Sequence, residues 1–272
     1  MPPQQSLTRR ADGYYGQFCF DADRKEQGEY SGNVIGIDLG LKSFYKDQNN
    51  KAVECPKFLR KAEKRLKQQR RRLSRKFVKG AKPQSNNYHK QKKRLGRVHL
   101  KFQRQRKDWE IKLARNVVAS NDVMVYEDLK VSNMVKNHPL AKSISDASWY
   151  QFTQSLDYYG RIWGKAVVAV PTNYTSQGCS NCGHRVKKSL STRTHACPID
   201  WGVEMCCDTN AALNILKKGM AILGIDWQNS TQRHWGSGEK SRTTEEIIAS
   251  AMNGQPKIVS NVVESVTRIL SL

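Results

Sequence analysis

Short runs of apolar residues, each closed by glycine, proline or charged residues, recur along the chain and have the length of buried strands. The run at 33–40 is followed closely by two shorter runs, at 43–47 and 51–54. These three runs predict a three-stranded meander that begins at the centre of a sheet. An alternating segment at 6–20 carries the turn signal Asp12-Gly13 and predicts a β-hairpin. The other predicted strands are residues 33–40, 43–47, 51–54, 122–129 and 166–170.

Between these runs, apolar residues at spacings of three, four and seven predict helices. Two such segments, 57–79 and 87–120, are separated by a break at 80–85 and predict a helical hairpin. Strands that alternate with helices in this way indicate an α/β or α+β fold layered around a mixed sheet. The remaining predicted elements are an aromatic-rich amphipathic helix at 147–165, a short helix at 208–219 ended by Gly219, and a late strand and helix at 257–272.

Charge changes this picture most in the helical hairpin. The chain has 47 Lys and Arg against 24 Asp and Glu, and residues 57–107 alone hold 22 of the basic residues and one acid, Glu63. Unbalanced like charge destabilises a helix unless a counter-anion is present, so we favour binding to a nucleic-acid backbone over a merely solvated helix face. The candidate contacts are Arg65, Arg70, Arg71, Arg72, Arg75, Lys92, Lys93, Arg94 and Arg97.

An anionic membrane surface would also attract a net charge of +23, but no apolar run approaches the roughly 20 residues of a spanning helix. The N-terminus MPPQQSLTRRADG lacks a signal-peptide core. We therefore expect a soluble intracellular protein with no membrane partner. Seven cysteines, an odd number with two pairs of close neighbours, fit metal binding in a reducing compartment better than a disulfide framework.

Three carboxylates are candidates for a catalytic metal site. Asp38 ends the first strand, Glu127 ends another strand and Asp208 opens a late helix. Convergence of such residues would suit two Mg²⁺ or Mn²⁺ ions, because phosphodiester cleavage with two metals requires oxygen ligands on both sides of the reacting phosphorus. Taken singly, each position also fits a turn residue or a helix N-cap, and Asp128 competes with Glu127 for the inward position.

A second metal site is indicated by the pair Cys179 and Cys182, two residues apart and followed by glycine, which is the composition of a zinc knuckle. Cys197 lies further along, and the position where a fourth cysteine is expected holds Asp200. The interpretation is a structural zinc site with three cysteines and one aspartate, or alternatively a site that has lost its metal. Replacement fourth ligands are His184, His195, Cys206 and Cys207.

Four motifs in order resemble the TnpB family of transposon-encoded proteins, which are related to the type V CRISPR effectors. They are GIDLG at 36–40, VYEDL at 125–129, YTSQGCSNCGHRVKKSLSTRTHACP at 174–198 and DTNAALNIL at 208–216. The resemblance implies a ribonuclease-H-like (RuvC-type) α/β fold with a zinc-ribbon insert and a basic helical-hairpin insertion. It also implies that Asp38, Glu127 and Asp208 are the catalytic metal-binding carboxylates, and that three cysteines match zinc ligands.

The resemblance implies the following organisation: a remnant hairpin of an upstream wedge-type domain at 1–30, a RuvC-like nuclease domain at 31–175 and 205–222 with the basic hairpin at 57–120, a zinc-ribbon-like insert at 176–204 and an unassigned tail at 223–272. Where family members read Asp-Arg-Asp before the last helix, this chain reads Cys206-Cys207-Asp208.

The leading hypothesis is a magnesium-dependent DNA endonuclease that is guided by RNA, with DNA and a guide RNA as partners. An N-terminally truncated remnant that binds nucleic acid without cutting it is the alternative, and a transposase that carries out strand transfer is ranked last. We expect a monomer or weak oligomer in the prokaryotic cytoplasm, associated with the nucleoid.

Overall fold

The computed structural model describes residues 5–19, 22, 24, 26, 31–189, 192–200 and 202–225. The chain divides into two compact units. Of the described residues, the first unit contains those up to Arg24 and Lys57–Glu110; the second contains those from Glu26 to Pro56 and from Ile111 to Ile225. The strand and helix predicted at 257–272 lie outside the described residues.

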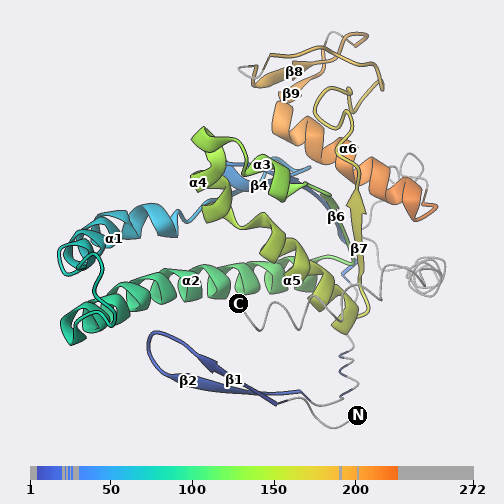
Figure 1. The fold of residues 1–272 in the computed structure, drawn as a ribbon. Coiled ribbons are helices and arrows are strands. Elements are labelled where there is room, and N and C mark those ends of the chain that lie inside the picture. The colour runs from blue at the N-terminus through green and yellow to red at the C-terminus, as the bar shows by residue number, and fades with distance from the viewer. Residues whose placement is uncertain are drawn as a thin grey trace. The chain divides into compact units, whose positions relative to one another are not determined.

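The N-terminal hairpin of the first unit is confirmed. Strands β1 (Gln5–Arg9) and β2 (Tyr14–Phe18) pair antiparallel around the predicted turn (Figure 1). Arg104 fixes this turn, because its guanidinium lies 2.7 Å from the Asp12 carboxylate and 2.6 Å from the Tyr15 hydroxyl.

The helical hairpin is also confirmed, with α1 at Phe58–Ser74 and α2 at Asn86–Ser120. The prediction that α1 reaches residue 79 was wrong. Beyond Ser74 the chain forms a loop in which Gln84 binds both backbone groups of Val78, and Phe77 is 55% exposed. Like-charged residues dominate this stretch and offer little apolar surface to bury, so nothing extends the helix.

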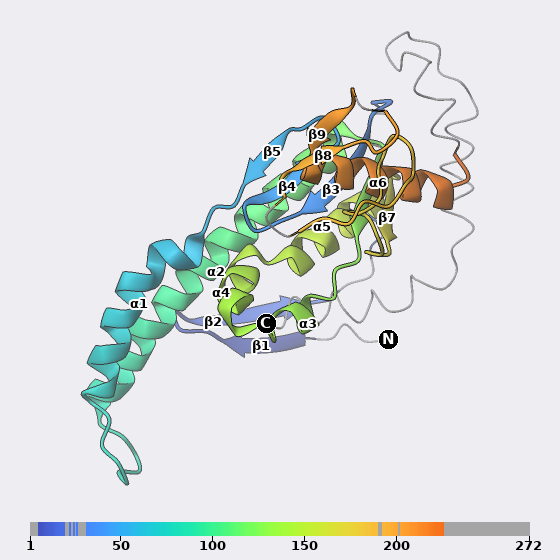
Figure 2. The same cartoon turned by 90° about the horizontal axis from the view of Figure 1, so that it is seen from above.

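A five-stranded mixed sheet forms the centre of the second unit. Strand order is β5-β4-β3-β6-β7, in which β3, β4 and β5 are antiparallel neighbours and β3, β6 and β7 are parallel (Figures 1 and 2). The predicted meander at the sheet centre and the mixed α/β class are therefore confirmed. The strands are β3 (Val34–Leu39), β4 (Ser43–Asp47), β5 (Ala52–Glu54), β6 (Val123–Glu127) and β7 (Ala166–Val170).

Helix α6 (Cys207–Ile222) packs on one face of this sheet. Its residues Ile215, Leu216 and Met220 form a buried core with alternate residues of β6 and β7, and each such side chain contributes about 1.5–3 kcal/mol by leaving water. The prediction that Gly219 ends the helix was wrong. Gly219 lies within the helix, and its lack of a side chain is explained by packing, because a Cβ there would come within 2.4 Å of the Val125 methyl groups.

Helix α5 (Trp149–Ile162) covers the opposite face, where the Tyr126 hydroxyl of β6 donates to the Asp157 carboxylate at 3.2 Å and Phe152 packs edge-on against Phe44. The prediction placed its start at 147, but Ser148 adopts a left-handed φ of 58° and separates α5 from the preceding helix. That helix, α4 (His138–Ala147), and the short α3 (Val131–Met134) were not predicted. Among the described helices, none combines the length and apolarity needed to cross a bilayer.

Candidate metal centres

Two of the predicted carboxylates lie side by side at one edge of the sheet. The parallel pairing of β3 and β6 aligns Gly36 with Val125, so two residues further along Asp38 is level with Glu127. Gly36 and Val125 both face α6, and the alternation of side chains therefore turns Asp38 and Glu127 to the same face. Glu127 is buried and Asp128 is exposed, so Glu127 is the inward residue of this pair.

The third carboxylate, Asp208, lies in the first turn of α6, two residues after the N-cap residue Cys206. Its charge acts on Asp38. Burial, followed by the charges of Glu127 and Asp208, raises the pKa of Asp38 to about 8, while Lys46 acts in the opposite direction. Burial also raises the pKa of Glu127. Asp38 therefore interacts electrostatically with both of the other predicted acids.

Several neighbours of these acids were not predicted. Lys46, which pairs with Asp38 across β3 and β4, donates to Cys206 Sγ at 3.2 Å. Thr175 and Lys218 both lower the pKa of Glu127. A signal for Lys46 was its place in the predicted strand that pairs with the strand of Asp38, but Thr175 and Lys218 come from segments whose approach only the tertiary fold determines.

The carboxylate group fits a divalent cation in its chemistry. Oxygen ligands are those that Mg²⁺ and Mn²⁺ prefer. Burial disfavours the ionised forms of Asp38 and Glu127, and the neighbouring acids add to this at Asp38, so a cation would stabilise the ionised group. Among the described residues, only the cysteine group discussed below has ligand atoms that all lie within 4.8 Å of one another. The carboxylate oxygens of the three acids therefore do not all lie this close together.

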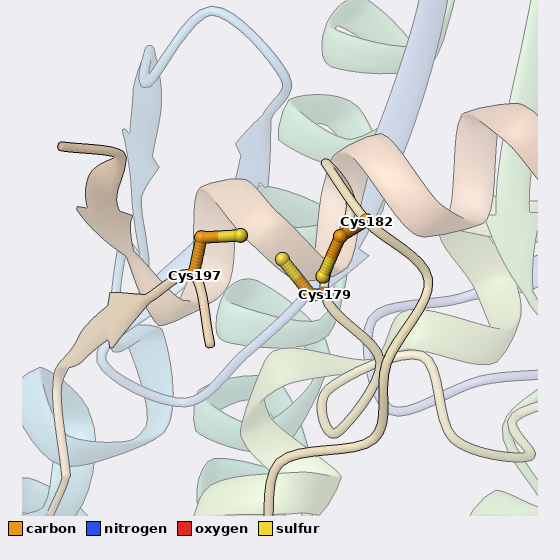
Figure 3. A group of neighbouring side chains, drawn as sticks. All are labelled: Cys179, Cys182 and Cys197. Atoms are coloured by element: carbon orange, nitrogen blue, oxygen red, sulfur yellow. The ribbon is translucent and has the colours of Figure 1, made fainter. Parts of the chain in front are cut away.

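The cysteine group consists of Cys179, Cys182 and Cys197, whose side chains point toward one another (Figure 3). The N–H of Asp200 donates to Cys197 Sγ at 3.3 Å, and this bond is the main cause that lowers the pKa of Cys197 to about 7. The N–H of His184 lowers the pKa of Cys182, but burial and the two neighbouring thiols raise it overall. Three soft sulfur ligands at this spacing fit zinc.

The structure does not bring the carboxylate of Asp200 into this group. Its Oδ1 accepts the N–H of Gly202 at 3.4 Å, and only its backbone contacts Cys197. Of the alternative ligands, Cys206 lies beside Lys46 at the other centre. His195, on strand β8 (Thr194–Ala196), is completely buried, and neither ring nitrogen has a hydrogen-bond partner within the described part of the chain.

Strand β8 pairs antiparallel with β9 (Glu204–Cys206), which leads directly into α6, and Figure 2 shows this small sheet beside the start of the helix. The polypeptide that carries the cysteines is thus attached at the point where the helix with Asp208 begins.

The nine predicted nucleic-acid contacts are all exposed in the first unit; eight lie on α1 and α2, and Arg75 is the C-cap of α1. They are Arg65, Arg70, Arg71, Arg72, Arg75, Lys92, Lys93, Arg94 and Arg97.

Comparison with known proteins bears on both units. A family model described as "Probable transposase" matches residues 17–138, and one described as "Cas12f1-like, TNB domain" matches residues 149–215. The chain is 35% identical over 238 residues to the "Putative RNA-guided DNA endonuclease InsQ" of Escherichia coli K12, which covers 81% of this chain and 56% of that protein. It is 35% identical over 190 residues to a "Putative RNA-guided DNA endonuclease" of Streptomyces pristinaespiralis, which covers 69% and 46%.

A third relative, the "TnpB-like protein L79" of Acanthamoeba polyphaga mimivirus, is 30% identical over 69% of this chain and 38% of its own length. These similarities place the chain in a class of transposon-associated proteins, and two of the relatives in this class are named as RNA-guided DNA endonucleases. The chain belongs to the TnpB family, as the four sequence motifs predicted. It spans about half the length of the first two of these relatives.

Proposed function

We propose that this chain is the nuclease part of an RNA-guided DNA endonuclease, with Asp38, Glu127 and Asp208 as its metal-binding carboxylates. The observation that carries the proposal is the convergence of the three acids. They come from two parallel strands and a helix that are far apart in sequence, and they interact at one edge of the sheet beneath α6. Acids that served only as turn or capping residues would have no reason to meet.

The sheet supports a ribonuclease-H-like, RuvC-type fold for the second unit. A meander that starts at the central strand and continues into parallel strands on the other side is the arrangement expected for that fold. The proposal includes the domain organisation predicted from the sequence. The nuclease domain comprises 31–175 and 205–222, with the basic helical hairpin at 57–120, and the zinc-ribbon-like insert comprises 176–204.

The roles of the side chains follow from their positions. A divalent metal held by the three carboxylates would activate water and stabilise charge on the phosphate. Lys46 and Lys218 partly neutralise the acids and would attract a phosphodiester backbone toward them. Burial of Asp38 and Glu127 under α6 limits the water that reaches them, and their interactions are stronger for it.

DNA and a guide RNA are the proposed partners. The nine exposed basic residues of the helical hairpin would hold a nucleic-acid backbone through charge, independent of its sequence. The names of the two bacterial relatives support RNA guidance.

The test is magnesium-dependent cleavage of labelled single- and double-stranded DNA by the purified protein together with its co-purifying RNA. The parent should cleave and Asp38→Asn should not. The matched control is Asp128→Asn, because Asp128 is the exposed neighbour of Glu127 and should be dispensable. Salt-sensitive binding without cleavage, the same in all three proteins, would instead support a nucleic-acid-binding protein without catalysis.

A further inference from the structure

Two asparagines of α6 hold the loop that carries the first cysteine. Asn210 is completely buried, accepts the N–H of Ser180 at 2.8 Å and donates to the carbonyl of Gly178 at 2.7 Å. Asn214 donates to the carbonyls of Gly178 and Thr175 at 2.7 and 2.9 Å. Cys179 is therefore held through the backbone on both of its sides.

These asparagines share one face of the helix, since they are four residues apart. Asparagine is a weak helix former, and burying its amide is costly unless the amide is hydrogen-bonded. Asn210 and Asn214 meet that condition only while the loop keeps its present backbone path. Lys217, one turn beyond Asn214, donates to the carbonyl of Ser180 and adds a third attachment on the same side.

The same loop reaches the carboxylate centre at its other end. Thr175, whose carbonyl accepts from Asn214, presents its side chain to Glu127 and lowers the pKa of that acid. Asn210 follows Asp208 by two residues on the helix. A continuous series of covalent and hydrogen bonds therefore runs from Cys179, through Asn210 and Asn214, to two of the three carboxylates.

We propose that Asn210 and Asn214 are positioning residues that couple metal occupancy of the cysteine group to metal affinity of the carboxylate group. The proposal rests on the proposed function for the carboxylates. An ion bound by Cys179, Cys182 and Cys197 fixes the loop, the asparagines transmit the fixed loop position to α6 and Thr175, and Asp208 and Glu127 keep their binding geometry. Loss of that ion loosens the loop and weakens the carboxylate site.

The experiment measures Mn²⁺ binding by electron paramagnetic resonance in the full chain, with zinc loaded and after its removal. Mn²⁺ reports the carboxylate centre because it prefers oxygen ligands to thiolates. In the parent, zinc removal should raise the Kd for Mn²⁺ about 10-fold or more, as loss of a supporting contact does at other metal sites. Asn214→Ala with zinc loaded should cause a similar rise.

Non-additivity identifies the coupling. Once zinc has been removed, Asn214→Ala should change the Mn²⁺ Kd by less than about 2-fold, because the connection is already broken. Asn137→Ala, an exposed asparagine outside the loop, is the control and should have no effect in either state. If Asn214→Ala lowers the urea midpoint of the protein, Lys217→Met replaces it, since that change keeps the aliphatic part of the side chain and removes the donor to the Ser180 carbonyl.

The inference is overturned if zinc removal leaves the Kd for Mn²⁺ unchanged. It is also overturned if the increases in Kd caused by zinc removal and by Asn214→Ala multiply in full when the two are combined. A different result refutes the proposed function itself: Mn²⁺ that binds the parent and Asp38→Asn equally well is not held by the carboxylate group.

Discussion

The burial of Asp38 among other acids should make the metal-free protein lose stability as the pH rises. In the folded chain its pKa is raised from 3.8 to about 8, first by burial and then by Glu127 and Asp208. Well below pH 3.8 the side chain is protonated in both the folded and the unfolded chain, so it imposes no penalty. As the pH rises toward 8 the unfolded chain releases this proton and the folded chain retains it, which favours unfolding.

The size of the effect follows from the shift. Each unit of pKa difference is worth about 1.4 kcal/mol, so the penalty grows by roughly 3 to 4 kcal/mol between pH 5 and pH 8. A domain of this size typically unfolds with a free energy of about 5–15 kcal/mol, so the loss is a large fraction of the total. Asp38→Asn removes the titrating group, and its free energy of unfolding should exceed that of the parent by an amount that increases with pH.

The assay is urea denaturation of protein dialysed free of Mg²⁺ and Mn²⁺, at intervals from pH 5 to pH 8. Adding Mg²⁺ at pH 8 should stabilise the parent, because the ion favours ionised Asp38, and should affect Asp38→Asn much less. Asp128→Asn is the control and should follow the parent throughout, since Asp128 is exposed. A constant difference between Asp38→Asn and the parent across this pH range would refute the electrostatic argument.

Three further predictions concern packing, zinc and nucleic acid. Gly219→Ala should lower the free energy of unfolding by about 1–3 kcal/mol, because the added methyl group overpacks against β6. Thermal denaturation measures this loss, with Gly13→Ala as the control, since an added Cβ at Gly13 meets nothing within 4 Å. Asp200→Cys should tighten Co²⁺ binding at the cysteine group at least about 10-fold and intensify its visible absorption, whereas unchanged affinity would mean that another donor already completes the site. Replacing the three arginines at 70–72 by glutamine should weaken the salt dependence of DNA binding. The slope of the logarithm of the binding constant against the logarithm of the salt concentration should fall in magnitude by up to about 3, and an unchanged slope would place the phosphate contacts elsewhere.

The sheet and its long helices could be predicted because each has a strong local pattern. Strand β6 is buried on both faces and therefore reads as a continuous apolar run, and α2 keeps a helical spacing over its full length. The errors occur where tertiary packing overrides a local signal. Gly219 resembles a helix end by composition, but the approach of Val125 is what requires glycine there. Helix α4 has only a short apolar face, at Ile144 and Ala147, and escaped prediction.

The candidate sites show the same limit. Position within a strand predicts that Asp38 and Glu127 end neighbouring strands, but which of Glu127 and Asp128 faces α6 depends on a register that only strand pairing fixes. The cysteines could be grouped by their spacing alone. The contacts of Asn214 with the cysteine loop could not, because they join segments about forty residues apart whose approach depends on how α6 packs.

Cys206 departs from the family motif, but its contacts in the fold limit the effect of this change on the neighbouring acids. Cys206 stands where family members carry an acid, and it is the N-cap of the helix that bears Asp208. Burial opposes its ionisation, but the N–H groups of Asp208 and Thr209 and the Lys46 ammonium together lower its pKa. When ionised, Cys206 adds to the negative charge that raises the pKa of Asp38. Lys46 therefore still faces a partner whose ionised form it stabilises, although that partner is a thiol in place of an acid.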